Sequence, residues 1–172
     1  VTADTTRPIP AFFFSRDGRF ILFVQDQGGD ENFNLYAVDP RAAPAPSSDV
    51  PPARNLTDAD GVRVALYALP KTQPDTAYIG LNQRDPAWHD LYELNLSSGE
   101  LTLLRENTER ISGWTFDLAG ELRLAIRSPE NGDTEILRVE EDGFAPLYVC
   151  GVFETCNPAR FHPDGERVYM VT

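Results

Sequence analysis

The sequence is poor in histidine, cysteine and basic residues, and each shortage narrows its possible functions. Its 172 residues include two histidines and two cysteines, and 15 lysines and arginines stand against 27 aspartates and glutamates, for a net charge of −12. Binding of nucleic acid requires a basic face, and the basic residues here are scattered. We therefore expect no nucleic-acid partner, and the acidic balance mainly favours solubility.

Long apolar runs and catalytic motifs are also missing. No run approaches the roughly 20 apolar residues of a membrane-spanning helix, and the first residues do not form a signal peptide, so we expect no membrane partner.

No Gly-x-Ser-x-Gly motif marks a hydrolase nucleophile. The only histidines are His89 and His162, and we expect His162 to make hydrogen bonds in a turn. The sequence predicts no catalytic residue, no cofactor and no metal site. The short stretch 58–61 lacks most ligands of a calcium loop.

A repeated pattern of turn and strand is the main positive feature. The turn residues Gly18, Thr76, Gly120 and Gly165 lie 58, 44 and 45 positions apart. The first interval is long because it contains the proline-rich insert 41–53, which we expect to be an irregular loop. A period in the mid-forties with four strands per unit is typical of a propeller blade. A second landmark follows each complete turn, at 35–36, 91–92 and 136–137.

The fold class that this repeat predicts is all-β. We expect a β-propeller fragment of about three and a half four-stranded antiparallel blades, with residues 1–172 forming one partial propeller domain. Since so few blades do not close a ring, we expect a piece of a longer protein. The blades are predicted at about 11–57, 62–106, 111–150 and, incomplete, 157–172. Their strands are predicted at 11–15, 20–25, 34–39 and 54–56; 65–69, 77–82, 90–96 and 100–105; 113–117, 121–127, 135–140 and 145–150; 159–162 and 167–171.

Three segments carry more detailed expectations. Phe20–Val24 has no polar face, so we expect neighbouring blades to cover it on both sides. Leu122, Leu124 and Ile126 alternate with more polar residues, as in a half-exposed strand. Residues 100–112 have an apolar spacing that a helix would also explain, but the preceding Ser98-Gly99 turn favours a strand.

The two cysteines, Cys150 and Cys156, lie between the outer strand of one blade and the inner strand of the next. We expect partly buried free thiols. A disulfide that closes this crossover is the alternative, and zinc would need further ligands. The sequence leaves the compartment undecided, with the cytoplasm favoured over the periplasm, and so it leaves the pairing undecided as well.

The loops between the second and third strands, at 25–33, 82–89 and 128–134, should emerge on one face of a propeller. We expect them to be either ordinary polar hairpin tips or a docking surface. In the turn 29–32, Asp30 or Asn32 should fix the hairpin through side-chain-to-backbone hydrogen bonds. The face would collect Asp26, Asp30, Glu31, Arg84, Asp85, Trp88, His89, Glu130 and Asp133. The candidate interdomain or substrate-facing residues are Asp30, Glu31, Arg84, Asp85, Trp88 and His89.

The segment 7–40 resembles the propeller of prolyl oligopeptidase family serine peptidases, particularly acylaminoacyl-peptidase and dipeptidyl-peptidase-like members. The residues that carry this resemblance are Arg7-Pro8-Ile9, Asp17-Gly18, Gln25-Asp26, Gly29-Asp30-Glu31-Asn32 and Leu35-Tyr36-Ala37-Val38-Asp39, with Asp90-Leu91-Tyr92-Glu93-Leu94 and Phe161-His162-Pro163-Asp164-Gly165 fitting the same repeat.

The resemblance implies an N-terminal propeller that lies over a C-terminal α/β-hydrolase domain of the same protein and restricts access to oligopeptide substrates. The catalytic serine, aspartate and histidine would belong to the hydrolase domain, and none matches a position here. The peptide specificity stays undefined. The alternative is a TolB-like or WD-type propeller that acts as a protein-binding module without enzymatic activity. In either case, open blade edges would favour self-association.

Overall fold

The structure is a computed structural model that describes residues 2–46 and 48–172. Fourteen strands form three four-stranded antiparallel sheets and one antiparallel pair. In the described part of the chain, no helix has the length and hydropathy needed to span a membrane. An all-β fold was expected from the repeat, and it is confirmed.

Each sheet is built from strands that are consecutive in the chain and are hydrogen-bonded in chain order. The first contains β1 (Ala11–Phe14), β2 (Ile21–Gln25), β3 (Asn34–Val38) and β4 (Arg54–Asn55). The second contains β5 (Val64–Ala68), β6 (Thr76–Asp85), β7 (Trp88–Asn95) and β8 (Leu101–Arg105). The third contains β9 (Ile111–Phe116), β10 (Leu122–Arg127), β11 (Thr134–Glu140) and β12 (Gly143–Cys150). The last pair is β13 (Asn157–Phe161) with β14 (Val168–Val171).

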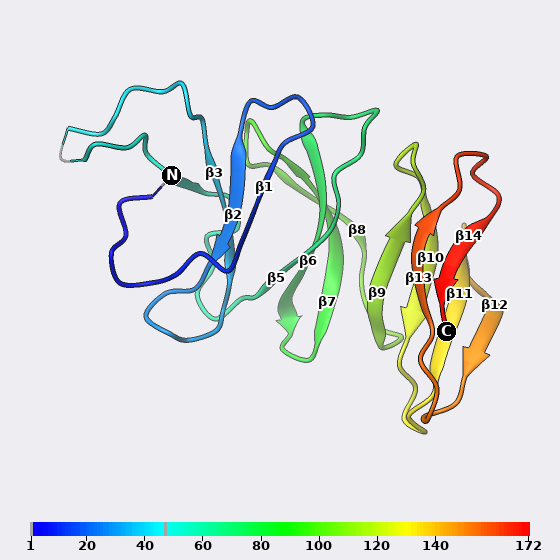
Figure 1. The fold of residues 1–172 in the computed structure, drawn as a ribbon. Helices are drawn as coiled ribbons and strands as arrows, with labels where there is room; N and C mark the ends of the chain where they lie inside the picture. The colour runs from blue at the N-terminus through cyan, green and yellow to red at the C-terminus, as the bar shows by residue number, and fades with distance from the viewer. Residues whose placement is uncertain (1, 47) are drawn as a thin grey trace.

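Figure 1 shows the sheets side by side in chain order, from blue to red, with their strands running up and down. An apolar cluster lies between each sheet and the next. Leu22 and Leu35 of the first sheet pack with Leu94 of the second. Leu91, three residues earlier on the same strand, packs instead with Trp114 of the third. Since successive β residues alternate between faces, one strand thus serves two interfaces. This radial stacking is the architecture of a β-propeller.

A third cluster joins the third sheet to the last pair, where Leu124 and Ile136 pack with Phe161. Residues 101–105 form a strand, so the sequence signal for a strand was correct there and a helix over 100–112 does not form. A neighbouring sheet covers Phe20–Val24 on one face only, so the expectation of neighbouring blades on both sides is not met within the described residues. Leu22 is 0% exposed against the second sheet. Phe23, on the other face, is 1% exposed because it stacks on Tyr36 of its own sheet, with ring centroids 5.0 Å apart.

Strand β10 is not half exposed, and that prediction was wrong. Ala125 is fully buried against the second sheet, while Leu124 is buried against the last pair. An irregularity in the pairing with β9 lies between Leu122 and Leu124 and shifts the alternation of faces. The polar residues of this strand therefore do not mark a solvent-facing side.

Cys150 and Cys156 form a disulfide, so the expectation of free thiols was wrong. Cys150 ends β12 and Cys156 lies just before β13, and both are buried in the cluster between these two sheets. Their Cα atoms are 6.1 Å apart, within the range that a disulfide bridges. The chain reverses direction between them, which a six-residue spacing in the sequence does not reveal.

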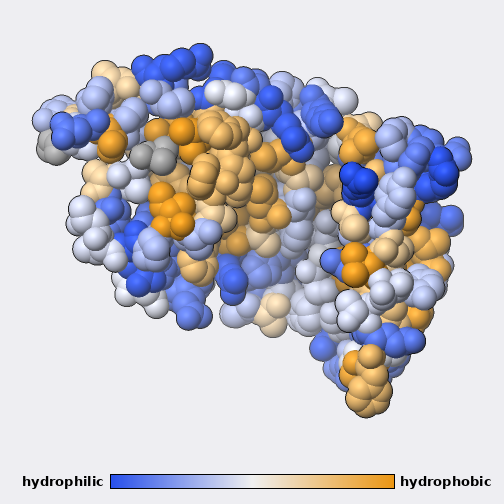
Figure 2. Space-filling view, in the orientation of Figure 1, coloured by the Kyte–Doolittle hydropathy of each residue, from blue (hydrophilic) through white to orange (hydrophobic). Residues whose placement is uncertain are grey.

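The outer faces of the first and last sheets carry exposed apolar side chains. Phe12 and Phe14 of β1 are 64% and 58% exposed, and Tyr169 and Val171 of β14 are 49% and 54% exposed. Figure 2 shows apolar side chains gathered over the first sheet. No sheet covers these faces within the described residues.

We predict that the chain self-associates at high concentration through these faces, because burial of exposed aromatic side chains favours contact. Sedimentation velocity should show species larger than a monomer, and Phe12→Glu with Phe14→Glu should restore the monomer. Leu103→Glu, a change to an exposed leucine on the outer strand β8, is the matched control and should not. A monomer at millimolar concentration would contradict the prediction.

We also predict that the disulfide stabilises the fold. Closing the short loop between Cys150 and Cys156 reduces the entropy of the unfolded chain and should contribute about 2 kcal/mol. Urea unfolding with and without dithiothreitol measures this contribution. The reductant should have no effect on the double variant Cys150→Ala/Cys156→Ala, and an equal effect on both proteins would show that the bond does not form.

Candidate functional site

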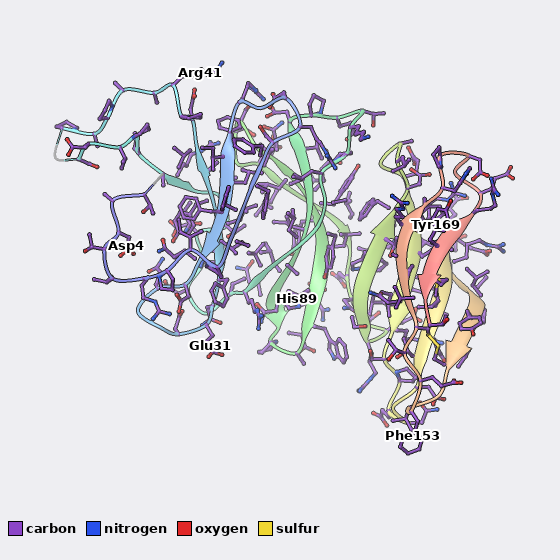
Figure 3. The ribbon with its side chains drawn as sticks, in the orientation of Figure 1. Asp4, Glu31, Arg41, His89, Phe153 and Tyr169 are labelled. Atoms are coloured by element: carbon purple, nitrogen blue, oxygen red, sulfur yellow. A yellow bond between two sulfur atoms is a disulfide. The ribbon has the colours of Figure 1, made fainter. Side chains whose placement is uncertain are left out.

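The loops that join second and third strands lie on one end of the sheets, together with the crossovers that lead from one sheet to the next. Figure 3 places Glu31, His89 and Phe153 at this end, which we call the lower face. It is formed by the segments 26–33, 56–63, 85–89, 106–110, 128–133 and 151–156. The expected gathering of equivalent loops therefore occurs.

Asp26 lies just after β2 and is buried by the N-terminal segment. The guanidinium of Arg7 donates to both of its carboxylate oxygens, at 3.0 Å from Nε and 2.5 Å from Nη2. These bonds hold the pKa of Asp26 below its ordinary value. The neighbouring Gln25 side-chain amide donates to the backbone carbonyl of Arg7 at 3.1 Å. Asp26 therefore fastens the start of the chain to the first sheet and is not available to a ligand.

Asp30 and Glu31 lie in the same loop but have different surroundings. The Oδ1 atom of Asp30 accepts the backbone N–H of Asn32 at 3.1 Å and that of Gln27 at 3.3 Å. This is the turn-fixing role that the sequence suggested. Glu31 has a φ of 60° and an exposed side chain, which makes no hydrogen bond or ion pair among the described residues. Glu31 is therefore the freer carboxylate of this loop.

The second sheet carries a buried ion-pair network. The guanidinium of Arg84 donates to Asp90 at 2.9 Å and 2.7 Å, and it also reaches the carbonyl of Asn107 at 2.8 Å. The backbone N–H of Asn107 donates to Asp90 at 2.7 Å. Burial of Asp90 opposes its ionisation, but these donors outweigh burial and keep its pKa below the ordinary value.

Asn107 extends this network to the next sheet. Its side chain accepts the backbone N–H of Ile111 at 2.8 Å and donates to the Ile111 carbonyl at 2.6 Å. Ile111 begins β9, so the network fixes the crossover between the second and third sheets. Arg84 therefore has a structural partner, and only part of its side chain faces solvent.

His89 is packed close to the backbone of β6. A Cβ atom on Gly80 would lie 2.6 Å from the Tyr67 hydroxyl and 2.8 Å from the Cβ of His89, so only glycine fits there. The Nε2 atom of His89 is buried and has no hydrogen-bond partner among the described residues. Burial, together with the charge of Arg63, lowers the pKa of His89, so the ring is neutral at pH 7.

Trp88 and Arg110 join the tips of the second and third sheets. The guanidinium of Arg110 lies 5.1 Å from the centroid of the Trp88 ring, within cation–π distance. Arg110 also donates to the carbonyl of Ser128 at 2.9 Å and lies 3.6 Å from Glu130. The backbone of Arg110 is in the left-handed region, with a φ of 61°. Arg110 thus contacts Trp88 of the second sheet and Glu130 of the third sheet at the same time.

The remaining predicted residues accept hydrogen bonds from other residues of the turns in which they lie. Asp85 accepts the backbone N–H of Ala87 at 2.9 Å, and Asp133 accepts the side-chain amide of Asn131 at 2.7 Å. His162 lies at the opposite end of the sheets and accepts the backbone N–H of Asp164 at 3.2 Å, the turn role that we expected. Within residues 2–46 and 48–172, no group of three or more His, Cys, Asp or Glu side chains is placed to hold a metal ion.

The structure thus brings Arg84, Trp88 and His89 together on the second sheet, while Asp30 and Glu31 occupy a separate loop of the first. Sequence reasoning did not single out four residues that form hydrogen bonds or ion pairs at the lower face: Arg7, Asp90, Asn107 and Arg110. One signal was available for Asp90, because Arg84 and Asp90 flank the Asp85–Trp88 turn on paired strands. The other three come from distant segments and had no local signal.

Comparisons with known proteins agree with the resemblance seen in the sequence. No family model matches the chain. It is 34% identical over 173 residues to dipeptidyl aminopeptidase BIII of Pseudoxanthomonas mexicana, which covers 99% of this chain and 24% of that protein. It is 31% identical over 137 residues to dipeptidyl peptidase family member 6 of Caenorhabditis elegans, covering 80% of this chain and 18% of that protein. The chain therefore spans about a quarter or less of the length of these relatives.

Two solved structures share the fold. TolB from Acinetobacter baumannii superposes with a TM-score of 0.62 at 16% identity and covers 93% of this chain and 37% of its own. The apo form of prolyl oligopeptidase B from Galerina marginata has a TM-score of 0.61 at 14% identity and covers 99% of this chain and 24% of its own. At these identities the likeness shows the fold alone.

The class is therefore that of β-propellers. Within it, the sequence relationship to the two dipeptidyl-peptidase-like proteins, over 99% and 80% of the chain, confirms the resemblance to the propeller part of the prolyl oligopeptidase family.

Asp30→Ala should lower the free energy of unfolding by about 1 kcal/mol, because two backbone amides lose their acceptor. Glu31→Ala, at the neighbouring exposed position, is the matched control and should change it by less than about 0.5 kcal/mol. Urea denaturation of both variants checks this. Equal losses would remove the distinction between a turn residue and a free carboxylate.

Asp90→Asn should lower the free energy of unfolding by about 2 kcal/mol at pH 7, because charged hydrogen bonds to Arg84 and the Asn107 amide are lost. The folded pKa of Asp90 is depressed, so its stabilisation is present above the unfolded value of about 3.9 and is lost as the pH falls through the lower folded pKa. Urea denaturation from pH 7 to pH 2 should show the two proteins converging. A constant difference would contradict the assignment.

Proposed function

We propose that this chain is the non-catalytic propeller part of a serine oligopeptidase, and that it limits the access of peptides to an α/β-hydrolase domain of the same protein. The observation that carries the proposal is the 34% identity along 99% of this chain to a protein named as a dipeptidyl aminopeptidase, of which the chain covers only 24%. The remainder of such a protein has room for the hydrolase domain.

The lower face supports a gating role in two ways. Paired charges and the disulfide hold its loops in fixed positions, as in Arg84 with Asp90 and Cys150 with Cys156. At the same time it leaves some side chains uncommitted, above all Glu31 and the fully exposed Phe153. A surface with fixed loops and a few unpaired side chains is suited to contact another domain or a peptide substrate.

A protein-binding propeller without enzymatic activity is the second candidate, and the superposition with TolB favours it. The two candidates differ in the coding sequence downstream of residue 172. Further blades and then a Gly-x-Ser-x-Gly segment would support the peptidase, whereas an end after ring closure would support the binding module.

The gating proposal predicts an effect that depends on substrate length. In the full-length protein, Glu31→Ala should change the turnover of oligopeptides severalfold while leaving that of a short chromogenic dipeptidyl substrate unchanged, because only the longer substrate would meet the loop. Glu121→Ala, an exposed glutamate at the other end of the sheets, is the matched control.

The 172-residue chain by itself should hydrolyse neither substrate, and a fluorophosphonate probe should not label it, because it lacks a nucleophile motif. Stoichiometric labelling of a serine in this chain would overturn the proposed division of labour. Equal effects of the glutamate variants on long and short substrates would overturn gating by this loop.

A further inference from the structure

The end of the sheets opposite the lower face contains two adjoining depressions, of about 300 Å³ and 320 Å³, which share Lys71 and Leu118 in their walls. The first begins at Arg16, in the turn after β1, and the second ends at Arg160 and Tyr169 of the last pair. Together the two depressions have lining residues from all four sheets, and they lie by the turns that join first and second strands at the top of Figure 1. We call the two adjoining depressions the upper groove.

Direct contacts between sheets shape this groove. The Nε atom of Arg16 donates to the carbonyl of Leu69 at 2.6 Å, which ties the first sheet to the second. The hydroxyl of Thr72 donates to the carbonyl of Ala119 at 2.5 Å, which ties the second sheet to the third. The groove is thus preformed. Its lining is largely apolar and includes Leu66, Leu69, Phe116, Phe161 and Pro163.

The charge of the groove is opposite to that of the chain. Arg16, Lys71 and Arg160 line it, and none of the three has a carboxylate within ion-pair distance among the described residues. The chain carries 27 acidic residues, so this lack of partners is not due to a shortage of carboxylates. The one acidic lining residue, Asp117, is bonded to Arg123 at 2.9 Å and to two backbone amides.

The spacing of these cations favours an extended ligand. They come from three different sheets, and of the three only Lys71 lines both depressions, so a ligand that contacts all three must extend from one depression into the other. Arg160 lies with its guanidinium 5.3 Å from the centroid of Tyr169, a stacking that leaves the N–H edge free to bind a carboxylate. An extended peptide presents side chains at about 3.3 Å per residue and thus spreads several carboxylates along such a groove.

We propose that the upper groove binds an extended peptide segment that carries acidic side chains, with apolar residues between them against the groove walls. A nucleic acid is disfavoured because the net charge of −12 repels a long polyanion outside the groove. The proposal stands independently of the hydrolase domain and of gating at the lower face, since it concerns the opposite end of the sheets.

The test is fluorescence polarisation with a labelled peptide that has glutamate at every second position and leucine or alanine between. The chain should bind it, bind the same peptide with lysine in place of glutamate more weakly, and lose affinity as salt is added. The double variant Lys71→Glu/Arg160→Glu should bind the acidic peptide about tenfold more weakly. Arg41→Glu, an exposed arginine outside the groove, makes the same kind of charge change and should have little effect.

Circular dichroism of the variants keeps the test independent of folding, since all three substituted side chains are exposed. Three results would overturn the proposal: no binding of the acidic peptide, an equal affinity for the lysine peptide, or an equal loss in Arg41→Glu. Tighter binding of a single-stranded oligonucleotide than of the peptide would also overturn it, in favour of a polyanion site.

Discussion

Burial of apolar side chains between successive sheets is the interaction on which the rest of this structure depends. Each sheet is apolar on both faces, so it needs a neighbour on each side. Strand β7 illustrates this requirement, because Leu91 and Leu94 are both 0% exposed but belong to different interfaces. Fully burying one such side chain is worth about 2 kcal/mol, which exceeds the contribution of an exposed ion pair. The positions of all the surface loops follow from this stacking.

Polar contacts then fix how each sheet ends. At the lower face, arginine–carboxylate pairs recur in all three complete sheets: Arg7 with Asp26, Arg84 with Asp90, and Arg127 with Glu135. The second and third pairs each join the two strands of one hairpin, and the first joins the N-terminal segment to the first sheet. Most charges of the lower face are therefore engaged within the chain, which leaves few residues, such as Glu31, for contacts with another domain or a peptide.

The sequence predicted those parts of the fold that depend on local signals. Turn residues and apolar strands repeat with a regular period, so the strands and the propeller class could be derived without the structure. Features that depend on distant segments could not. The disulfide needs the reversal between β12 and β13, and the burial of Ala125 needs the second sheet. The partner of Asp26, Arg7, likewise lies outside the loop in which this aspartate was noticed.

The same distinction applies to the site residues. Asp30 was assigned a turn role from its type and position, and its bonds to Asn32 and Gln27 agree with that role, since such bonds span only a few residues. Arg84 was chosen as a candidate docking residue from its place in an exposed loop. Its bidentate pair with buried Asp90 gives it a structural partner, which was missed although the two residues flank the same turn.

Net charge is a poor guide to the local surface of this protein. A formal charge of −12 describes the whole chain, but charges in water interact strongly only within about 8–10 Å. Over that distance, what matters is whether a charged side chain already has a partner. The lower face gathers many acidic residues and neutralises several of them internally, whereas the upper groove gathers few basic residues and leaves Arg16, Lys71 and Arg160 unmatched by any described carboxylate. An acidic chain can thus carry a local group of unpaired cations that attracts an acidic ligand.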